Sequence, residues 1–380
     1  MTRVLIASDS FKGSATSNEV ADYIATGAHQ ADPTIQVTTV PIADGGEGTV
    51  NSVLAAVGGQ AYTASVVGPL GQTVEAQWGM IDQETAIVEV AEAAGLNLAK
   101  SDLDPMLTTT YGVGQMIQAA LNRGASKIYI GLGGSATNDG GIGMAQALGG
   151  HFYDSANHEL AYGGNGLMQL DHIDLSQMDQ RLKNTVIVGL TDVANPLTGP
   201  QGAAKVFGPQ KGANKEMIQL LDQGLSLLDQ TLQAQLTIDC GEVPGAGAAG
   251  GTGFGILSFL GGQLKPGIEE IMRLVKLDAR ISKSDLVITG EGQIDGQSLM
   301  GKAPIGIAHL AKQHGLPVIL IAGSIGDNIQ AVYASGVDLV LSSTASPMSV
   351  NRAIANVRPL LTQAGYTAMR AFNLNRVLID

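Results

Sequence analysis

Residues 4–13 read VLIASDSFKG, an apolar, β-branched run that stops at a carboxylate in a turn rich in serine and glycine. Four other stretches repeat this pattern: TTVPIADGGEG at Asp44, IYIGLGGSATNDGG at Asp139, VIVGLTDVANP at Asp192, and LVITGEGQID at Glu291 and Asp295. In open α/β sheets, ligands bind at the carboxyl ends of the strands. Glycine there lets the backbone approach a phosphate, and carboxylates there can hold Mg²⁺. The sequence therefore predicts an α/β protein with one site for a phosphorylated ligand and a metal ion.

The composition is that of a globular protein with more than one core. The chain has 380 residues, of which 44% are hydrophobic and 14% are charged. At roughly 100–200 residues per domain, this length predicts two or three domains. The 51 glycines far exceed the usual share of about 7%. They gather at strand ends, which favours ligand-binding loops over flexible linkers.

Charge and cysteine usage narrow the possible partners and the compartment. With 21 basic and 34 acidic residues, the net charge is −13, which argues against nucleic acid and anionic membranes as partners. The single cysteine, Cys240, cannot form an intrachain disulfide, and this is typical of a reducing compartment. The apolar run at the start is too short for a signal peptide, and no run approaches the ~20 residues of a spanning helix. We therefore expect a soluble cytoplasmic protein.

Both ends of the chain alternate between strand and helix patterns. The N-terminal part predicts strands at 3–8 and 35–42, a helix capped by Thr16 and Glu19, and a helix at 49–57. The C-terminal third predicts strands at 285–289, 317–322 and 337–342, with helices at 304–314, 329–335 and 350–364. Two strands from the front and three from the back predict one five-stranded parallel sheet, the size of a flavodoxin-like doubly wound domain.

The middle of the chain has a different pattern. Its predicted strands are 62–67, 74–80, 86–90, 127–130, 185–189 and 236–239, and its predicted helices are 112–123, 138–148 and 215–232. This mixture indicates a second, mixed α/β domain inserted into the first. We expect residues 1–60 plus 283–380 to form the flavodoxin-like domain and residues 61–282 the inserted one. Because domain interfaces commonly hold ligands, the active site is expected in the cleft between them.

The segment from Gly131 to Gly150 is the strongest single phosphate-binding pattern. A strand enters a Gly-Gly-Ser turn, and a helix is expected to begin near Asn138 or Asp139. Backbone N–H groups at such a helix start can cradle a phosphate, and the hydroxyl groups of Ser135 and Thr137 add donors. The alternative is a glycine-rich turn that serves packing.

Three carboxylates and one lysine are further candidates, each with a plainer alternative. Asp192 follows a clear strand but stands before Asn-Pro, so it either binds a ligand or forms a turn. Glu291 and Asp295 would share one face if their segment were helical. They could then hold Mg²⁺ or supply a general base, or else be solvated acids. Lys302 precedes a proline at an expected helix start, where it either contacts a phosphate or is simply exposed.

Two familiar motifs match only in part. GAGAAG at 245–250 fits the dinucleotide fingerprint, but a strand must precede that fingerprint and here four residues intervene. An NAD-dependent oxidoreductase is therefore the weaker alternative, which thermal protection by NAD rather than ATP would reveal. GQSLMGK at 296–302 resembles a P-loop, but Ala303 replaces the hydroxyl residue that binds Mg²⁺. The histidines show no metal-ligand spacing.

Read together, the motifs resemble one family. They are ASDSFKGSATSNEVA, PIADGGEGT, GLGGSATNDGG, TDVANPLTGPQGAAKVFGPQKGA, GAGAAGGTGFG, and VITGEG with ID and GKAP. In this order, from Ser8 to about Ala308, they resemble the bacterial class I glycerate kinase family. The resemblance implies a flavodoxin-like domain interrupted by a second α/β domain. It also implies Mg²⁺-dependent transfer of the ATP γ-phosphoryl group to D-glycerate, giving 2-phosphoglycerate, with 3-phosphoglycerate as the alternative product. We expect a monomer or a homodimer.

The resemblance also suggests roles for the residues that bind glycerate. Ser10 and Lys12 would bind its carboxylate or the transferring phosphate, and Lys12 would stabilise charge. Asp44, with the amides of Gly45 and Gly46, would orient the hydroxyl groups and act as the base. Such assignments suit phosphoryl transfer, which depends on positioning and charge neutralisation.

A second group of residues would bind ATP and Mg²⁺. Gly133, Gly134, Ser135, Asn138 and Asp139 would cradle the ATP phosphates. Lys211 and Lys302 would be further phosphate contacts. Asp192 would hold Mg²⁺ and take part in catalysis. Glu291 or Asp295 is the second metal candidate, and Glu291 is also a candidate for substrate binding. The remaining alternative is a non-catalytic, effector-binding protein, which a test of turnover would separate from a kinase.

Overall fold

The computed structural model describes residues 1–100, 102–295 and 302–377. The chain divides into two compact units. Unit 1 comprises Met1–Asp44, Asn51–Val57 and Ile268–Asp380, and unit 2 comprises Gly45–Val50 and Gly58–Gly267. The division at 267/268 differs from the expected boundary at 282/283. The helix α10 (Leu277–Ile281) packs against α11 (Ala303–Gln313), which places it with unit 1.

Unit 1 is built on a five-stranded, fully parallel sheet. The order is β2-β1-β11-β12-β13. The strands are β1 (Arg3–Ser8), β2 (Gln36–Pro41), β11 (Leu286–Ile294), β12 (Val318–Ile325) and β13 (Leu339–Ser342). The five predicted strands are thus confirmed, although β11 continues past its predicted end. The winding direction changes between β1 and β11, and in sheets of this kind ligands usually bind at the carboxyl ends of the strands where the direction changes.

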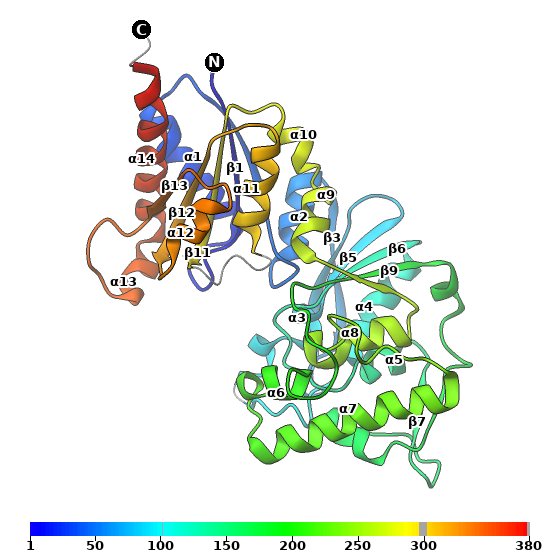
Figure 1. Cartoon of the computed structure of the whole chain (residues 1–380). Coiled ribbons are helices and arrows are strands. Elements are labelled where there is room, and N and C mark those ends of the chain that lie inside the picture. Colours follow the sequence, from blue (N-terminus) through cyan, green and yellow to red (C-terminus); the bar gives the residue numbers. More distant parts are fainter. Residues whose placement is uncertain (101, 296–301, 378–380) are drawn as a thin grey trace. The chain divides into compact units, whose positions relative to one another are not determined.

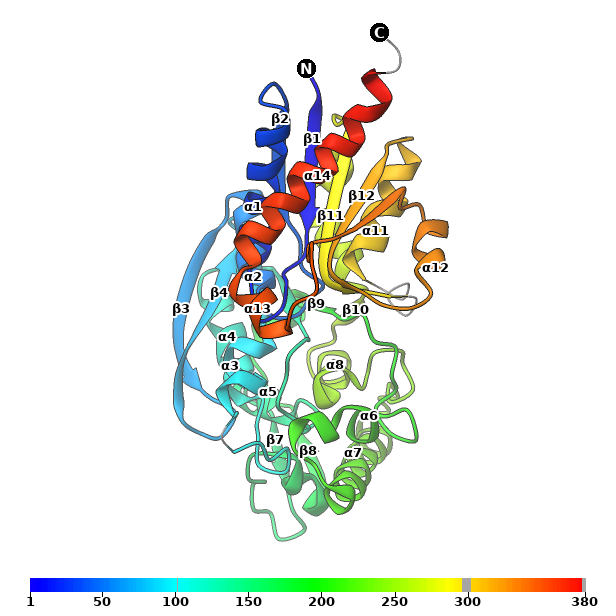
Figure 2. The ribbon, with the colours of Figure 1, turned by 90° about the vertical axis from the view of Figure 1, so that its left-hand side faces the viewer.

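Helices cover both faces of this sheet because its strands are apolar on both sides. Helices α1 (Ser17–Ala31) and α14 (Val357–Val377) run side by side (Figures 1 and 2) and share a core with Val4 and Ile6. Leu5 and Ala7 are equally buried and point to the opposite face, where α11 contacts β1, β11 and β12. Smaller helices complete the unit: α2 (Thr49–Val57), α9 (Gly267–Leu274), α12 (Ile329–Ala334) and α13 (Val350–Ala355).

Of two local predictions about the helices of unit 1, one is confirmed and one is wrong. The capping box of Thr16 and Glu19 is present at the start of α1 and is confirmed. The single helix predicted at 350–364 is wrong: α13 ends at Ala355, and α14 then continues to Val377. The backbone leaves the helical conformation at Asn356, a local change that side-chain periodicity does not report.

The contact between α1 and α14 depends on glycine. A Cβ atom built on Gly27 would collide with the backbone carbonyl of Thr362. We expect Gly27→Ala to lower the free energy of unfolding by about 3 kcal/mol, at the upper end of overpacking costs, because only a shift of α14 relieves the clash. Urea denaturation of the variant would measure it.

The matched control is Gly306→Ala in α11. A Cβ there would lie 3.3 Å from Cε at the flexible end of Met272 and at an ordinary contact distance of 3.5 Å from Cγ1 of Ile268, so the stability of this variant should stay within about 1 kcal/mol of wild type. Equal denaturation midpoints for the two variants would contradict the close packing of α1 on α14.

Unit 2 contains a six-stranded mixed sheet in the order β10-β9-β6-β5-β4-β3. The strands are β3 (Gln60–Val67), β4 (Thr73–Met80), β5 (Thr85–Glu89), β6 (Lys127–Gly131), β9 (Val186–Leu190) and β10 (Gln263–Lys265). β3, β4 and β5 pair antiparallel, while β5, β6, β9 and β10 pair parallel. A short hairpin of β7 (His151–Tyr153) and β8 (His172–Asp174) lies outside this sheet. The predicted mixture of hairpins and crossovers is confirmed.

The helices of unit 2 correct two predictions. They are α3 (Val90–Ala94), α4 (Tyr111–Asn122), α5 (Ile142–Ala147), α6 (Ala203–Phe207), α7 (Lys215–Leu236) and α8 (Ala248–Ser258). The helix expected from Asn138 or Asp139 begins only at Ile142, because Gly140 and Gly141 have φ values of +65° and +77°. The strand expected at 236–239 is absent: α7 extends to Leu236, and Thr237 ends it in the left-handed region.

The GAGAAG segment serves packing in this fold. It leads into α8, but α7 and irregular chain precede it, not a strand. The dinucleotide fingerprint therefore lacks its required context. Gly250 has a φ of +67°, and a Cβ there would collide with the carbonyl oxygen of Thr137. The glycines let this segment lie directly on the backbone of the 131–141 loop.

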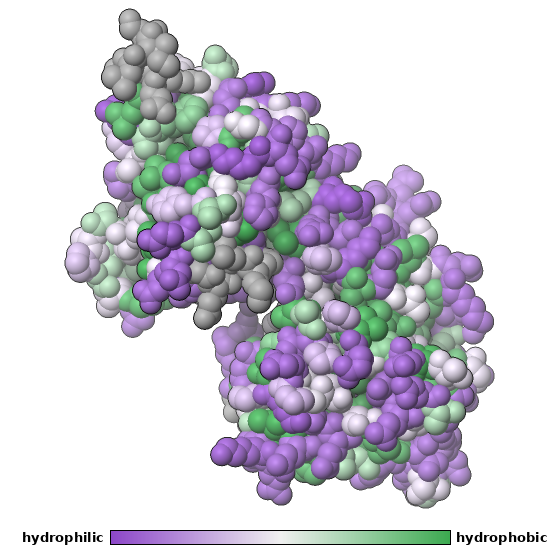
Figure 3. Space-filling view, viewed as in Figure 1, coloured by the Kyte–Doolittle hydropathy of each residue, from purple (hydrophilic) through white to green (hydrophobic). Residues whose placement is uncertain are grey.

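One face of the molecule is predominantly polar. On the face shown in Figure 3, hydrophilic residues predominate and hydrophobic ones occur in small groups. Across the described parts of the chain, no helix combines the length and the apolar character needed to cross a bilayer.

Candidate functional site

A tight loop after β1 presents Lys12 to solvent. Phe11 is buried, and its N–H donates to the carbonyl of Ala15 at 2.9 Å, while Ser14 donates back to the Phe11 carbonyl at 2.8 Å. The Lys12 side chain at the tip is 80% exposed, and its Nζ lies 3.9 Å from Oδ2 of Asp44, which follows β2. The structure thus brings together two residues that the sequence assigned to glycerate. Ser10 lies in the same loop and is half-buried.

Asp9 lies next to this pair and had no assigned role. It is buried, and its Oδ1 accepts the backbone N–H of Ser10. The pKa of the Asp9 carboxyl is raised to about 7, mainly by burial and also by the charges of Asp44 and Glu291, while the Ser10 N–H and Lys12 oppose the rise. A carboxyl that titrates near neutral pH at a strand end can exchange a proton with a ligand. The signal was available, since Asp9 ends the first strand-to-carboxylate pattern.

Glu291 is held by Lys302. Its Oε1 lies 2.8 Å from Nζ of Lys302, which also donates to the carbonyl of Gln293 at 3.2 Å. Burial raises the pKa of the Glu291 carboxyl, and Lys302 opposes the rise. The other oxygen, Oε2, is buried and has no hydrogen-bond partner among the described residues. A buried carboxylate oxygen without a hydrogen-bond partner fits an incoming cation or hydroxyl group.

The expectation that Glu291 and Asp295 share a helical face is wrong. Glu291 lies within β11, which stays extended to Ile294, and Asp295 follows it directly. At about 3.3 Å per residue, four positions along a strand separate two side chains by roughly 13 Å. Gly296–Gly301, which completes the P-loop likeness, lies outside the described residues. Over the described ranges, no group of three or more His, Cys, Asp or Glu residues is arranged to hold a metal ion by itself.

In unit 2, two glycine-rich segments lie backbone to backbone. The N–H of Gly133 donates to the carbonyl of Gly45 at 3.1 Å. A Cβ on Gly133 would collide with Cα of Gly46, so glycine is needed for this approach. Gly134 is exposed and has a φ of +74°. The four glycines that the sequence assigned to substrate and phosphate binding are thus neighbours.

The residues that follow Gly134 are buried. Lys211 is only 2% exposed, and its Nζ donates to Oγ of Ser135 at 2.9 Å and to the carbonyl of Thr137 at 2.6 Å. The amide oxygen and nitrogen of Asn138 are buried without partners among the described residues. In this conformation, Lys211 and Asn138 lie beneath the loop and support it from inside.

Asp139 joins the same loop to α4 and α5. Its Oδ2 accepts the backbone N–H and the hydroxyl group of Thr110, both at 2.8 Å, and its Oδ1 accepts the N–H of Gly141 at 3.1 Å. Burial raises the pKa of the Asp139 carboxyl, and these donors oppose the rise. The geometry gives Asp139 a structural function inside the loop.

The burial of Lys211 predicts a pH-dependent stability. Burial lowers the pKa of its ammonium group from 10.5 to about 7, and Asp139 opposes the change. Between these values the unfolded chain binds a proton that the folded protein does not, so stability rises with pH over this window. We expect Lys211→Met to remove this rise, measured by urea unfolding at pH 7, 8 and 9. Lys215→Met, at the exposed start of α7, should keep it, and equal pH slopes in wild type and Lys211→Met would refute the assignment.

Asp192 lies in an exposed loop after β9. Its Oδ1 accepts the N–H of Gly267, in the same unit, at 2.9 Å. Asp192 belongs to unit 2, whereas Glu291 and Asp295 belong to unit 1.

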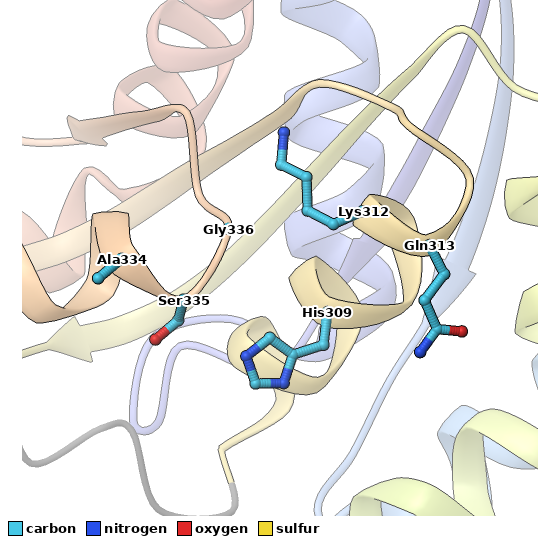
Figure 4. A pocket seen from close by; sticks show the side chains of 6 residues that line it. All are labelled: His309, Lys312, Gln313, Ala334, Ser335 and Gly336. Atoms are coloured by element: carbon cyan, nitrogen blue, oxygen red, sulfur yellow. The ribbon is translucent and has the colours of Figure 1, made fainter.

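Two surface pockets lie apart from all these residues. The pocket in Figure 4, of about 520 Å³, is lined by His309, Lys312 and Gln313 of α11 and by Ala334, Ser335 and Gly336. Nζ of Lys312 is paired with Asp338 at 2.6 Å. A second pocket, of about 370 Å³, is bordered by Tyr62 and Arg123, whose guanidinium stacks on the Tyr62 ring. Neither contains a residue assigned to a ligand, so neither is the candidate site.

Comparisons of the sequence and of the structure with known proteins both find glycerate kinases. The sequence pattern of the Glycerate kinase family matches residues 4–373. Glycerate 2-kinase of Escherichia coli K12 is 48% identical over 346 residues, which is 90% of this chain and 91% of that protein. Glycerate kinase of Bacillus subtilis 168 is 46% identical over 342 residues, 90% of each chain. A crystal structure described as a glycerate kinase 2 from Salmonella typhimurium LT2 superposes with a TM-score of 0.87 at 40% identity and covers 99% of both chains.

Proposed function

Because the chain belongs to the glycerate kinase family, we propose that it transfers the γ-phosphoryl group of ATP to D-glycerate, with Mg²⁺, and forms 2-phosphoglycerate. The observation that carries the choice of product is the 48% identity, over 90% of the chain, to a protein named glycerate 2-kinase. The polar groups at the strand ends of unit 1 support the chemistry, because phosphoryl transfer relies on positioning and on neutralising charge.

In unit 1, Lys12 and Asp44 have complementary roles in this proposal. The exposed ammonium group of Lys12 binds the glycerate carboxylate or the transferring phosphoryl group and stabilises its charge. Asp44 accepts a hydrogen bond from the attacking hydroxyl group and takes its proton. Ser10 adds a hydroxyl donor beside them, and Asp9 is a further proton acceptor within the same cluster.

In unit 2, the glycine-rich loop binds the ATP phosphates. The backbone of Gly133 and Gly134, which is open to solvent, supplies the contact surface, with Ser135 behind it. Asn138, Asp139 and Lys211 hold the loop in shape from inside. Lys302 precedes Pro304 at the start of α11, and its ammonium group is a further phosphate contact alongside Glu291.

The metal site of this proposal uses Asp192 together with Glu291 or Asp295. Carboxylate oxygens suit Mg²⁺, which in kinases usually takes one or two carboxylates and completes its shell with water and phosphate. The orphaned Oε2 of Glu291 fits this donor set. Bound Mg²⁺ would neutralise charge on the β- and γ-phosphates.

We expect Asp192→Asn to raise the Mg²⁺ concentration for half-maximal activity by about tenfold, because a charged ligand is lost, as with other losses at metal sites. The asparagine Oδ1 can still accept from Gly267, so the fold should persist. Titration of activity with Mg²⁺ at saturating ATP measures this, with Glu216→Gln on the exposed start of α7 as the control. An unchanged Mg²⁺ dependence would exclude Asp192 from the metal site.

The function itself is tested by ³¹P NMR of the protein with ATP, Mg²⁺ and D-glycerate. A new phosphomonoester resonance split by the single carbon-2 proton is expected. Splitting by the two carbon-3 protons would identify 3-phosphoglycerate instead. Reactions without glycerate control for ATP hydrolysis, and unconsumed ATP after hours would overturn the proposal.

We further propose that unit 1 is a flavodoxin-like doubly wound domain, supported by its strand order β2-β1-β11-β12-β13. We also propose a cytoplasmic monomer or homodimer that binds neither nucleic acid nor membranes. The net charge of −13 supports the absence of such partners.

A further inference from the structure

Glu89 is a buried carboxylate that no step above uses. It is the last residue of β5 and only 1% exposed. Its Oε2 accepts the N–H of Gly48 at 2.9 Å, and its Oε1 accepts the N–H of Val50 in a short hydrogen bond. Both oxygens therefore hold the first turn of α2, directly after the Gly45-Gly46 turn. The Thr49 hydroxyl group closes that turn by donating to the carbonyl of Gly46 at 2.7 Å.

Glu89 also borders the glycine-rich loop proposed to bind ATP. It pairs with Gly131 in the β5–β6 register. A Cβ on Gly131 would lie 2.7 Å from the carbonyl oxygen of Gly45 and 3.5 Å from Cγ of Glu89. The carboxylate side chain thus lies where the Gly45–Val50 segment meets the start of the 131–141 loop.

The residues after Glu89 hold the other side of the same loop. The N–H of Ala136 donates to the carbonyl of Ala94 at 2.8 Å, and the N–H of Leu96 donates to the carbonyl of Gly134 at 2.9 Å. The segment from Glu89 to Leu96 therefore fixes both ligand loops, one through a carboxylate and the other through its backbone.

The acidic neighbours of Glu89 make the burial of its ionised carboxylate unfavourable to the stability of the fold. The ionisable groups that act on it are Glu92 and Glu47, both acidic. Glu92 accepts the N–H of Gln77 at 2.9 Å, and Glu47 accepts from Asn97 at 2.8 Å. The pKa of the Glu89 carboxyl is raised to about 7, mainly by burial; the N–H groups of Val50 and Gly48 oppose the rise, and Glu92 and Glu47 add to it. A buried carboxylate that is not paired with a cation destabilises a fold, so a contribution to stability does not explain it.

We propose that Glu89 is a positioning residue that sets the Gly45-Gly46 turn against the Gly133–Ser135 loop, and so fixes glycerate relative to ATP. This inference rests on the proposed function of those loops. Two backbone N–H groups converge on the two carboxylate oxygens, and only an ionised carboxylate accepts from both without presenting a donor.

The test is Glu89→Gln, which keeps the shape but turns one oxygen into an NH₂ group. One backbone N–H then faces a donor and loses its acceptor. At pH 8 we expect kcat/KM for glycerate to fall at least tenfold. Stability to urea should change little, because removal of the buried charge offsets the backbone N–H group that loses its acceptor. A merely structural residue would show the reverse, lower stability with unchanged kinetics, and that result would overturn the proposal.

The pH dependence gives a second signature. A protonated carboxyl group and a carboxamide each offer one acceptor and one donor, so wild type should approach Glu89→Gln as the pH falls from 8 to 6. Because the pKa of Glu89 is raised from 4.5 to about 7 in the folded state, its ionisation also lowers wild-type stability as the pH rises from about 4.5 to about 7. Glu89→Gln should lack that decrease. If the ratio of wild-type to Glu89→Gln activity stays constant from pH 8 to pH 6, the charge of Glu89 has no role in catalysis.

Glu92→Gln is the matched control. Its carboxylate accepts from Gln77 and touches neither ligand loop, so its kinetics should match wild type. If Glu89→Gln does not fold, Glu89→Asp tests the same contact by shortening the side chain. Hydrogen exchange at residues 45–50 and 133–136 adds a readout independent of turnover. Faster exchange in Glu89→Gln supports positioning even if wild type proves inactive on glycerate, whereas equal exchange overturns it.

Discussion

Lys12→Ala is expected to lower kcat/KM for glycerate by about 10²–10³-fold, the loss that follows removal of one group that stabilises transition-state charge. The side chain stands at the exposed tip of the Phe11–Ala15 loop, and its ion pair with Asp44 spans 3.9 Å. Exposed pairs of this kind contribute about 0–1 kcal/mol to stability. The variant should therefore fold like wild type and fail in catalysis.

A coupled ATP-consumption assay with varied glycerate would measure this loss. Lys283→Ala removes an equally basic, exposed side chain from the same unit and should keep wild-type kinetics. Lys12→Arg keeps the charge on a bulkier group and should recover part of the activity. If Lys12→Ala retains wild-type kcat and KM, Lys12 has no part in the reaction.

Asp44→Asn is expected to lower kcat by about 10²–10³-fold, within the range for loss of a general base. Asparagine keeps the side-chain volume and one acceptor oxygen but cannot take a proton from the attacking hydroxyl group. The effect should fall mainly on kcat, because the amide still binds that hydroxyl group. Asp22→Asn on the exposed face of α1 is the control.

The double variant Lys12→Ala/Asp44→Asn tests whether the two side chains act together or independently in catalysis. Residues in contact couple by roughly 0.5–3 kcal/mol, so its loss should be smaller than the product of the two single losses. Multiplicative losses would show that the two side chains act separately. A kcat within twofold of wild type for Asp44→Asn would remove its role as the base.

Much of the fold could be predicted from the sequence because its strands are long and apolar. Apolar runs predict all five strands of unit 1, and the capping box marks the start of α1. Predictions failed where backbone conformation overrides side-chain pattern. Gly140 and Gly141 have positive φ and delay the start of α5. The β-branched Thr237 and Ile238 suit a strand, but Thr237 ends α7 in the left-handed conformation.

The parts of the candidate site that lie directly after a strand in the sequence could be predicted. The pairing of Lys12 with Asp44 follows from two neighbouring strands that end at one edge. Burial was not predictable, because it depends on segments far apart in sequence. Lys211 is enclosed by the 131–141 loop, and nothing near it distinguishes it from an exposed lysine. Glu89 resembled the end of an ordinary strand, because its partners are two backbone N–H groups some forty residues earlier.

The pairing of β1 with β11 has a consequence for synthesis on the ribosome. Val4 pairs with Leu286, so the N-terminal strands are made long before their central partner. At about 5–20 residues per second, this wait lasts tens of seconds. During it, one edge of β1 has no strand beside it, and unpaired edges of apolar strands are prone to aggregate. Such distant pairings also slow folding, because a very long loop must close first. The nascent chain should therefore depend on chaperones until residue 286 emerges, and β1 should be its most vulnerable segment.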